Sequence, residues 1–598
     1  MNYKIVTIML CLTLTTAAFT GCSAQDTGSS DVIATDSTDA QVISSSSVTS
    51  VSSSSDIATE DMFTDRDKEI GYDETTSVKI TLADGASTSA SSSVSIDGDT
   101  ITITDEGTYI LSGNLSDGQL IIDADSTDKV QLVLDNADIN CRTSAAIYVR
   151  TADKVFITLA PSSVNSLSNS DDFVAIDDNN IDAVIFSKSD LTLNGSGTLN
   201  VTAVYGHGIL SKDDLKFTSG TYVVSAADSA LSGKDSVRIA DGNFNLTAGK
   251  DGIHSENADD EDKGYIYIAG GSFTINADSD GLDSSSTMQI DGGTFNITVA
   301  DDAFHSDTEL IVNDGDINIS TCYEGLEAQS ITINGGTIDL YATDDGFNAA
   351  GGNDQSGFGG RGGDSFGSGD CIITINGGVI NINADGDGID SNGDLIVNGG
   401  EVYVSGPTDS ANGALDYGGS AEINGGYFVA VGSSGMAQNF GSASTQGSIM
   451  ITLSSYAEAG SDIILKSSDG STLLSYTAQK RYNNIVISCP DIEDGGTYTI
   501  TAGDSEATVT MDGLIYGGSM GGGFGGGMND RMNDGMNDGM RGGMKDNSGD
   551  ASTPEELPSA DGQEAPSDGF TFPDGQNGRG GMNNKSMGNA PDNKAMTQ

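Results

Sequence analysis

Acidic side chains recur in this sequence at a fixed place within a short repeated pattern. The pattern consists of an acidic residue, Gly or Ala, a large apolar residue, a polar residue, and Ser or Ala, as in residues 251–255, 280–284 and 387–391. Regularly spaced carboxylate and imidazole groups are able to bind metal ions, and a positioned pair of carboxyl groups is able to hydrolyse a glycosidic bond. Which chemistry applies depends on the elements that bring the copies of the pattern together.

The Gly or Ala of the pattern marks a repeat with a period near 22 residues. Successive markers are 22, 22, 29, 22, 22, 21, 42 and 26 residues apart, and the two longest gaps contain insertions at residues 257–263 and 351–370. Each copy continues with short alternating strands and a Gly-rich corner, and a fixed period of this size indicates a solenoid. We therefore predict an all-β chain, folded as a right-handed parallel β-helix with a small C-terminal β domain and disordered ends. The markers are Gly208, Ala230, Gly252, Gly281, Ala303, Gly325, Gly346, Gly388 and Ala414.

Stacked coils place equivalent residues about 4.8 Å apart, so the pattern predicts two columns of polar side chains. One column precedes the marker and the other follows the large apolar residue, which should point inward. Neighbouring carboxylates at this distance repel by about 1 kcal/mol in water and by more at a shielded site, and bound cations would offset that repulsion. Ca²⁺ prefers oxygen ligands, and the small marker residue between the columns would leave room for an ion. The predicted metal ligands are Asp251, His254, Asp280, Asp283, Asp302, His305, Glu324, Glu327, Asp345, Asp387 and Asp390.

A simpler interpretation of the two columns needs no metal. His207, Asn348 and the other His residues would divide the charges, and the remaining carboxylates would be solvated. A third predicted column has a structural role, because Asn tolerates a left-handed backbone and stacked amides hydrogen-bond to one another. This column lies at the Asn-Gly-Gly corners and consists of Asn313, Asn334, Asn376, Asn398 and Asn424.

The composition restricts the classes of partner. The net charge is −63, from 88 acidic and 25 basic residues, and such a chain repels nucleic acid and anionic membranes. It attracts cations, or polyanions through a bridging cation. Trp is absent, whereas sugar-binding proteins commonly use Trp and Tyr rings as platforms for neutral glycans. Four cysteines outside the N-terminal region allow two disulfides of unknown connectivity: Cys141, Cys322, Cys371 and Cys489.

The predicted organisation has five parts. Residues 1–22 contain Lys4, an apolar run over residues 5–19, and Cys22 after Thr-Gly, which is typical of a bacterial lipoprotein signal peptide. We therefore expect lipidation at Cys22 and a location on the extracellular face of the bacterial cell membrane, with the lipid as the only membrane contact; a plain signal peptide is the alternative. A Ser/Thr-rich linker (23–75), the β-helix (76–440), a small β capping domain (441–515) and a disordered tail rich in Gly, Met, Asn and Asp (516–598) follow.

Three features together resemble a known family. They are the segment Gly-Thr-Tyr-Ile-Leu-Ser-Gly-Asn at residues 107–114, the Asp-Gly-Ile-Asp-Ser type of repeat, and the Asn-Gly-Gly corners. They are similar to a clostridial-type surface carbohydrate-binding family with a pectate-lyase-like β-helix, over residues 76–515. The resemblance implies a monomer that binds cellulose-like or acidic plant polysaccharides without catalysis, and it implies that the acidic columns are the calcium positions. The absence of Trp favours uronate-rich polymers over cellulose.

Two other functions stay open. The first is a polysaccharide lyase or a polygalacturonase-like hydrolase, since residues 206–208 read Gly-His-Gly and Asp pairs occur at 301–302 and 344–345. Here, however, the Gly-His-Gly precedes the Asp pairs, which reverses the polygalacturonase order. A calcium-dependent lyase would need a base near the metal, for which Arg238 is the candidate. The second is a structural surface rod or adhesin, which would have no affinity for glycans.

Overall fold

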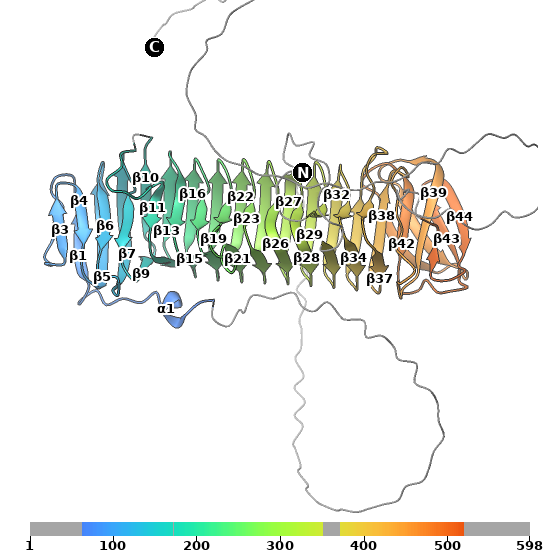
Figure 1. The fold of residues 1–598 in the computed structure, drawn as a ribbon, viewed down its shortest axis with the longest axis horizontal. Coiled ribbons are helices and arrows are strands. Elements are labelled where there is room, and N and C mark those ends of the chain that lie inside the picture. Colours follow the sequence, from blue (N-terminus) through green and yellow to red (C-terminus); the bar gives the residue numbers. More distant parts are fainter. Residues whose placement is uncertain (1–61, 172, 351–370, 519–598) are drawn as a thin grey trace, which may run out of the picture. The chain divides into compact units, whose positions relative to one another are not determined.

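The computed structural model describes residues 62–171, 173–350 and 371–518. Nearly every element in this part of the chain is a β-strand, and stacked coils follow one another along the sequence (Figure 1). Each coil contributes strands to three parallel ladders, here called sheets 1, 2 and 3. The predicted parallel β-helix is confirmed. Cys22, the signal peptide, most of the linker, the 351–370 insertion and nearly all of the tail lie outside the described residues.

Sheet 1 begins with the antiparallel hairpin of β3 (Val94–Asp97) and β4 (Thr100–Ile103) and then continues in parallel. Two longer strands turn a corner and pair in both sheets 1 and 2, namely β26 (Phe304–Val312) and β28 (Leu326–Ile333). The other strands of sheet 1 are β6 (Gln119–Asp123), β8 (Ile147–Thr151), β11 (Ala183–Ser187), β14 (His207–Ser211), β17 (Leu231–Gly233), β20 (Ile253–Ser255), β23 (Leu282–Ser284), β30 (Phe347–Ala349), β33 (Ile389–Ser391) and β36 (Leu415–Tyr417).

Sheet 2 follows the turn after sheet 1 and starts at β1 (Val78–Leu82), whose outer edge pairs with the short strand β2 (Thr88–Ser89). Two long strands run from sheet 2 into sheet 3, namely β5 (Gly107–Leu115) and β7 (Lys129–Cys141). The other strands of sheet 2 are β9 (Lys154–Leu159), β12 (Asp190–Gly195), β15 (Asp214–Phe217), β18 (Ser236–Ile239), β21 (Tyr265–Ile268), β24 (Thr287–Ile290), β31 (Ile372–Ile375), β34 (Asp394–Val397) and β37 (Ala421–Ile423).

Sheet 3 contains the most regular strands, in which buried and exposed residues alternate strictly from β19 to β25. This period of two is the reason that these segments form strands with one face in the core. The strands are β10 (Val164–Asn169), β13 (Thr198–Ala203), β16 (Thr221–Ala226), β19 (Asn243–Ala248), β22 (Ser272–Ala277), β25 (Thr294–Val299), β27 (Asp316–Cys322), β29 (Thr337–Ala342), β32 (Val379–Ala384), β35 (Glu401–Ser405) and β38 (Tyr427–Gly432).

The core runs through the middle of the coils as stacked identical positions. Tyr222, Phe244, Phe273 and Phe295 form a continuous column of rings, and Phe273 lies 4.9 Å and 4.6 Å from its two neighbours. The large apolar residue of the repeated pattern also points inward, as predicted. All six of these side chains are fully buried: Ile253, Leu282, Phe304, Leu326, Phe347 and Ile389.

The Asn column at the corners is confirmed as a chain of amide hydrogen bonds. Asn334 donates to Asn313 over 2.7 Å, and Asn376 donates to Asn334 over 2.8 Å. The left-handed residue of the corner is the second Gly and not the Asn, as at Gly336, where φ is 85°. The prediction was correct about the stacking and wrong about which residue adopts the left-handed backbone.

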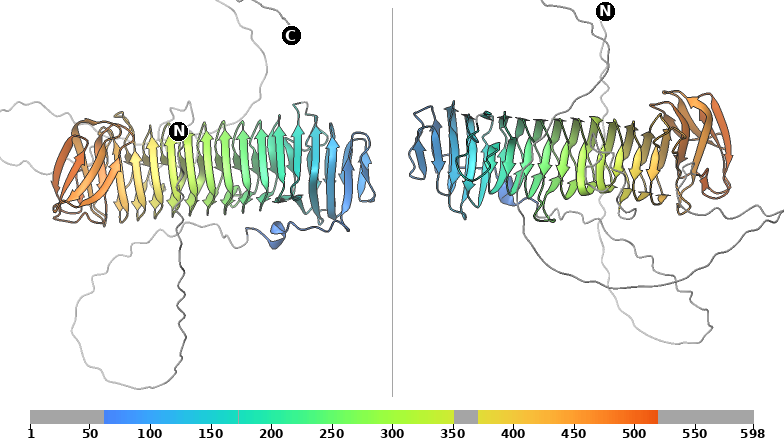
Figure 2. Two further views of the ribbon diagram at one scale, coloured as in Figure 1. Left: turned by 180° about the vertical axis from the view of Figure 1, so that it is seen from behind. Right: turned by 45° about the horizontal axis from the view of Figure 1, so that its top comes forward.

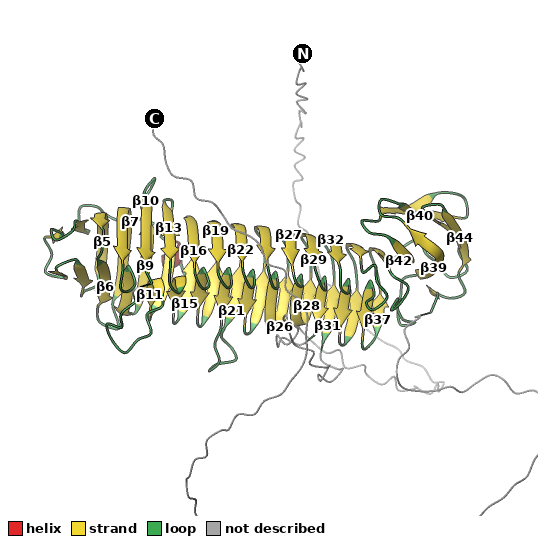
Figure 3. Cartoon of the chain, turned by 90° about the horizontal axis from the view of Figure 1, so that it is seen from above, coloured by secondary structure: helices red, strands yellow, loops and turns green. Residues whose placement is uncertain are grey.

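A small antiparallel region follows the last coil, as predicted (Figure 3). The strands β42 (Tyr482–Ser488) and β39 (Ser448–Ala457) extend sheet 3 in the antiparallel sense, and β45 (Ile515–Tyr516) pairs with β39. A separate four-stranded sheet has the order β41 (Thr472–Thr477), β40 (Asp462–Ser467), β43 (Thr497–Ala502), β44 (Ser505–Thr510). Apolar side chains from both sets of strands form one cluster, which includes Val429 and Leu465.

The predicted linker ends earlier than residue 75. Residues 62–77 lie along the outer face of sheet 2 and contain the short helix α1 (Asp65–Lys68) (Figure 2). Asp67 of this helix is fully buried, and its Oδ1 lies 2.7 Å from Nζ of Lys154. Thr192 and Thr218 donate hydrogen bonds to the side chain and the carbonyl of Asp67. The last part of the predicted linker is therefore docked on the β-helix.

The cysteines and helices of the described residues provide neither a disulfide link nor a membrane span. Cys141, Cys322, Cys371 and Cys489 are all buried, and the residues that the structure describes contain no disulfide bond. No helix within the described ranges is long and apolar enough to cross a membrane.

Candidate carboxylate site on sheet 1

The two predicted acidic columns exist in the structure. In the first, here called the corner column, each marker N–H donates to the carbonyl of the acidic position one coil later, as from Gly252 to Asp280 and from Gly281 to Asp302, both over 2.9 Å. In the second, here called the strand column, residues pair directly across sheet 1. The corner column is His207, Ser229, Asp251, Asp280, Asp302, Glu324, Asp345, Asp387 and Gly413. The strand column is Ser232, His254, Asp283, His305, Glu327, Asn348, Asp390 and Asp416.

Carboxylates of the corner column also form hydrogen bonds between successive coils. The Oδ1 atom of Asp280 accepts a hydrogen bond from the backbone N–H of Asp302 over 2.8 Å, and Asp302 accepts one from Glu324 over 3.1 Å. Asp345 accepts the N–H of Asp387 in the same way over 2.6 Å. The periodicity of the sequence did not predict these hydrogen bonds between coils. Each bond uses one carboxylate oxygen and leaves the other oxygen for another partner.

The marker residue is small for a different reason from the one predicted. A Cβ atom on Gly281 would lie 2.4 Å from the carbonyl oxygen of Ala303, and one on Gly325 would lie 2.2 Å from that of Gly346. The backbones of successive coils therefore approach too closely at these glycines for a side chain without displacement. The marker is small because of this contact between coils and not because it leaves room for an ion.

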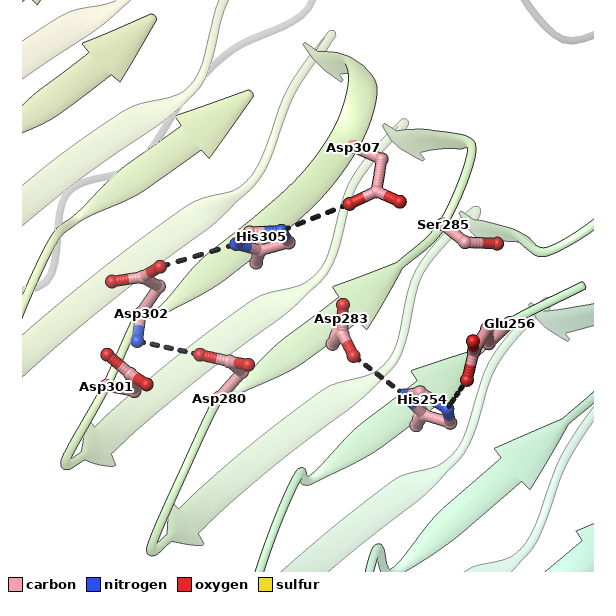
Figure 4. Close-up of a pocket in the computed structure, with 9 residues that line it drawn as sticks. All are labelled: His254, Glu256, Asp280, Asp283, Ser285, Asp301, Asp302, His305 and Asp307. Atoms are coloured by element: carbon pink, nitrogen blue, oxygen red, sulfur yellow. Dashed lines mark hydrogen bonds and ion pairs between the residues drawn. The ribbon is translucent and has the colours of Figure 1, made fainter. Parts of the chain in front are cut away.

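Four groups of side chains bring their ligand atoms within 4.8 Å of one another, and three of these groups line or adjoin one cavity (Figure 4). The cavity has a volume of about 320 Å³. Ten of the eleven predicted ligands are in these groups; the other, Glu324, accepts a hydrogen bond from Asn348 over 2.7 Å. Asp301, which precedes the corner column by one residue, was predicted only as part of an Asp pair for hydrolysis and not as a metal ligand. The groups are Asp251, His254 and Asp283; Asp302, His305 and Glu327; Asp280, Asp301 and Asp302; and Asp345, Asp387 and Asp390.

Burial raises the pKa values of five carboxyls in the corner column. Asp302 and Glu324 are almost inaccessible, and burial together with neighbouring carboxylates raises the pKa of each well above its usual range. The pKa values of Asp280 and Asp345 rise for the same two reasons. Burial raises the pKa of Asp387 to about 7. A cation held between these groups would remove the repulsion that destabilises their ionised forms.

The two His residues of the strand column have carboxylates on several sides. The Nδ1 atom of His305 lies 2.9 Å from Glu327 Oε2, and its Nε2 lies 3.4 Å from Asp307 Oδ1. Burial by itself lowers the pKa of His305, but hydrogen bonds to Asp302, Asp307 and Glu327 raise it overall. The Nδ1 atom of His254 lies 2.7 Å from Asp283 Oδ2. Burial lowers the pKa of His254, but the hydrogen bond to Asp283 and the neighbouring carboxylate charges raise it overall. An imidazolium supplies positive charge itself and has no lone pair for a metal.

The donor atoms fit calcium best where His is absent. Ca²⁺ takes oxygen ligands from carboxylates and amide carbonyls. The group around Asp280 and the group around Asp387 consist of carboxylates only. Asn348, which pairs with Asp390 in the strand column, has a buried Oδ1 atom with no hydrogen-bond donor among the described residues. This oxygen is a further possible ligand beside the second group.

Arg238 does not lie at the acidic columns. It is on β18 of sheet 2, where its Nη2 atom is 2.9 Å from Asp214 Oδ2 and its Nη1 atom donates to the carbonyl of Met62. The expectation that Arg238 is a base near a bound metal is therefore wrong. The basic residues close to the columns are instead Lys212, Lys234 and Lys250, which line a second cavity together with His207 and His254. These lysines were not predicted, because they lie outside the two positions of the repeat that define the acidic columns.

Parts of this chain are similar to known proteins. Residues 97–357 match a family model described as carbohydrate-binding domain-containing protein. A protein of that description from Acetivibrio thermocellus is 38% identical over 128 residues, which is 21% of this chain and 45% of the relative. The chain thus spans less than half the length of this curated relative. A solved structure, described as the polysaccharide lyase-like protein from C. thermocellum in a gadolinium derivative, is 35% identical with a TM-score of 0.37, and the match covers 37% of this chain and 91% of that one.

Proposed function

We propose that the protein binds acidic extracellular polysaccharide in a calcium-dependent and non-catalytic manner. The match of residues 97–357 to a carbohydrate-binding domain family supports a glycan as the ligand. The observation that carries the proposal is the alignment of carboxylate groups in two adjacent columns along one edge of sheet 1. Bound calcium would supply the positive charge that uronate carboxylates need on so acidic a protein. The surface location through a lipid on Cys22 is part of the same proposal.

The non-catalytic character is supported by the nearby lysines. A lyase base must lose its proton near neutral pH, which requires a lowered pKa. Lys250 lies 3.1 Å from Asp228, and the hydrogen bond and charge of that residue raise its pKa. The pKa of Lys234 is raised in the same way by Asp259. Both lysines are therefore arranged as permanent cations, which suits binding.

The test of the proposed metal site is a calcium titration of EDTA-treated protein by calorimetry. The isosteric double variant Asp345→Asn/Asp387→Asn keeps the hydrogen bond from residue 387 to residue 345 but removes two charges from one group. We expect it to bind fewer calcium ions than the wild type and to bind polygalacturonate more weakly in calcium. Asp316→Asn/Asp339→Asn, on sheet 3, is the matched control and should behave as the wild type. Equal calcium stoichiometry in the two double variants would contradict the proposal.

A neutral, cellulose-like polymer is a second candidate ligand because of one exposed tyrosine that is backed by a partly buried phenylalanine. Tyr205 is 41% exposed, and its ring centroid lies 4.7 Å from that of Phe173. Such a ring can pack against the apolar face of a sugar. Retardation of the wild type, but not of Tyr205→Ala, in gels that contain hydroxyethylcellulose would support this ligand. Free migration of the wild type would exclude it.

A further inference from the structure

A third column of charged side chains runs along the turn between sheets 1 and 2. Ser187 pairs with Val149 and with Ser211, so the next residues, Arg150, Lys188 and Lys212, occupy one position in successive coils. Ser211 pairs with Gly233, which places Lys234 in the following coil. The same position then changes character and is occupied by Glu256, Ser285 and Asp307. The turn is therefore basic over four coils and polar or acidic over the next three.

Two of the four basic residues in this column form no ion pair with a carboxylate of the described residues. Lys188 and Lys212 are exposed, and neither forms an ion pair with a carboxylate in the described ranges. Arg150 is held by Asp123 and Asp177 at the start of the column. Lys234 forms an ion pair with Asp259, whose side chain is 82% exposed and which belongs to the acidic insertion. The Nζ atom of Lys212 lies 5.7 Å from the ring centroid of Phe186, and neither Lys188 nor Lys212 has an anionic partner among the described residues, although the net charge of the chain is −63.

Part of the lysine column borders a cavity that adjoins the acidic site. Lys212, Lys234 and Lys250 line this second cavity, which has a volume of about 380 Å³. His254 and Glu256 line both this cavity and the carboxylate cavity shown in Figure 4. A ligand that passes along sheet 1 would thus meet positive side chains on the coils before residue 250 and carboxylate groups on the coils after it.

We propose that the column of Lys188, Lys212 and Lys234, with Lys250, binds carboxylate groups of an acidic polysaccharide directly, without a bridging metal. This inference rests on the proposed function and assigns a second, metal-independent part of the same binding surface. Neighbouring coils place these cations about 4.8 Å apart, so a polymer with one carboxylate on each sugar engages several of them at once. Repeated weak contacts along one chain combine into a much higher overall affinity. The change from lysine to carboxylate at Glu256 then fixes where direct contacts end and calcium-mediated contacts begin.

The test compares two triple variants that lose the same charge. Lys188→Gln/Lys212→Gln/Lys234→Gln removes the column, and Lys79→Gln/Lys129→Gln/Lys466→Gln removes three lysines on β1, β7 and β40. Affinity for polygalacturonate is measured in calcium and in EDTA at low and high salt, with fully methyl-esterified pectin as the polymer without carboxylates. We expect the wild type to keep weak, salt-sensitive binding to polygalacturonate in EDTA. In EDTA, the column variant should bind polygalacturonate at least tenfold more weakly than the wild type, and the control triple variant should bind it as the wild type does.

The outcomes separate this inference from the proposed function. If the wild type binds polygalacturonate in calcium but shows no binding in EDTA, the lysine column does not bind carboxylates directly and only the inference fails. It also fails if both triple variants retain the same affinity, or if methyl-esterified pectin binds as well as polygalacturonate. If the wild type binds no polymer even in calcium, the proposed function fails as well. Equal calcium stoichiometry in the two variants verifies that the acidic groups are intact.

Discussion

At the scale of single residues, some carboxylates of the site have a histidine as a neighbouring cation and others have only carboxylates beside them. His305 stands between Asp302, Asp307 and Glu327, so one group of the site already contains a cation. The groups around Asp280 and Asp387 consist of carboxylates only. Buried carboxylates that lie close together repel one another, and these two groups are therefore the places where a metal has the most to contribute.

The role of His305 as an internal cation can be tested by its removal. His305→Ala leaves three carboxylates without their counter-ion, and the loss of one partner from a buried ion pair costs about 3–5 kcal/mol. We expect the free energy of unfolding in EDTA to fall by about that amount, and we expect calcium to restore part of it. Denaturant unfolding with and without calcium measures both effects. Thr308→Ala, an exposed neighbour, is the control, and equal stabilities of the two variants would contradict the role.

The raised pKa values give the metal-free protein an unusual dependence on pH. The unfolded chain releases the protons of its Asp residues near pH 4, whereas native Asp387 keeps its proton until about pH 7. The native state therefore binds more protons in this window, and stability falls as the pH rises through it. Carboxyls with lowered pKa values, such as Asp67, have finished titrating below the window.

We accordingly expect the melting temperature in EDTA to be lower at pH 7.5 than at pH 5. Calcium should remove this difference, because it binds the deprotonated carboxylates. Thermal unfolding at the two pH values, with calcium and with EDTA, measures the effect. A melting temperature in EDTA that rises from pH 5 to pH 7.5 would show that the buried carboxyls are not destabilised when ionised.

At the scale of elements, the sequence predicts the coils well and their attachments poorly. The repeat determines the register of sheets 1 and 3, because one buried position recurs in each coil, as at Phe273 and Phe295. Helix α1 could not be predicted, because four residues carry no periodic signal and the contacts of Asp67 with the β-helix are with residues more than 80 positions away. The two acidic columns followed from spacing alone. The lysine column and Asp301 lie at positions where the residue type changes from coil to coil, so no constant pattern marks them.

The docking of residues 62–77 depends on Asp67 and can be tested there. Asp67→Asn leaves Lys154, which is 8% exposed, with Asp190 at 3.9 Å as its remaining charged partner, and the loss of the closer partner from a buried ion pair costs about 3–5 kcal/mol. We expect residues 62–77 to detach, while the coils keep their structure. Limited proteolysis should then cut this segment faster in Asp67→Asn than in the wild type, and the exposed neighbour Asp65→Asn serves as the control. Equal cleavage of the two variants would contradict the importance of the ion pair.

At the scale of the whole molecule, the chain combines a highly acidic body with a predicted lipid anchor. Cys22→Ala should release the protein from the membrane fraction into the culture medium, because the lipid is the only expected membrane contact. Fractionation followed by immunoblotting measures the distribution of the protein. Retention of Cys22→Ala in the membrane fraction would show that another segment anchors the chain.

The central claim is that calcium on the acidic columns allows this polyanionic protein to bind a polyanionic glycan. The most direct measurement is affinity electrophoresis of the purified protein through gels that contain polygalacturonate, with calcium or with EDTA. The account predicts strong retardation in calcium and much weaker retardation in EDTA, with the polymer left intact. Equal mobility in the presence and absence of calcium would contradict the account, and degradation of the polymer would show that the protein is a lyase or hydrolase.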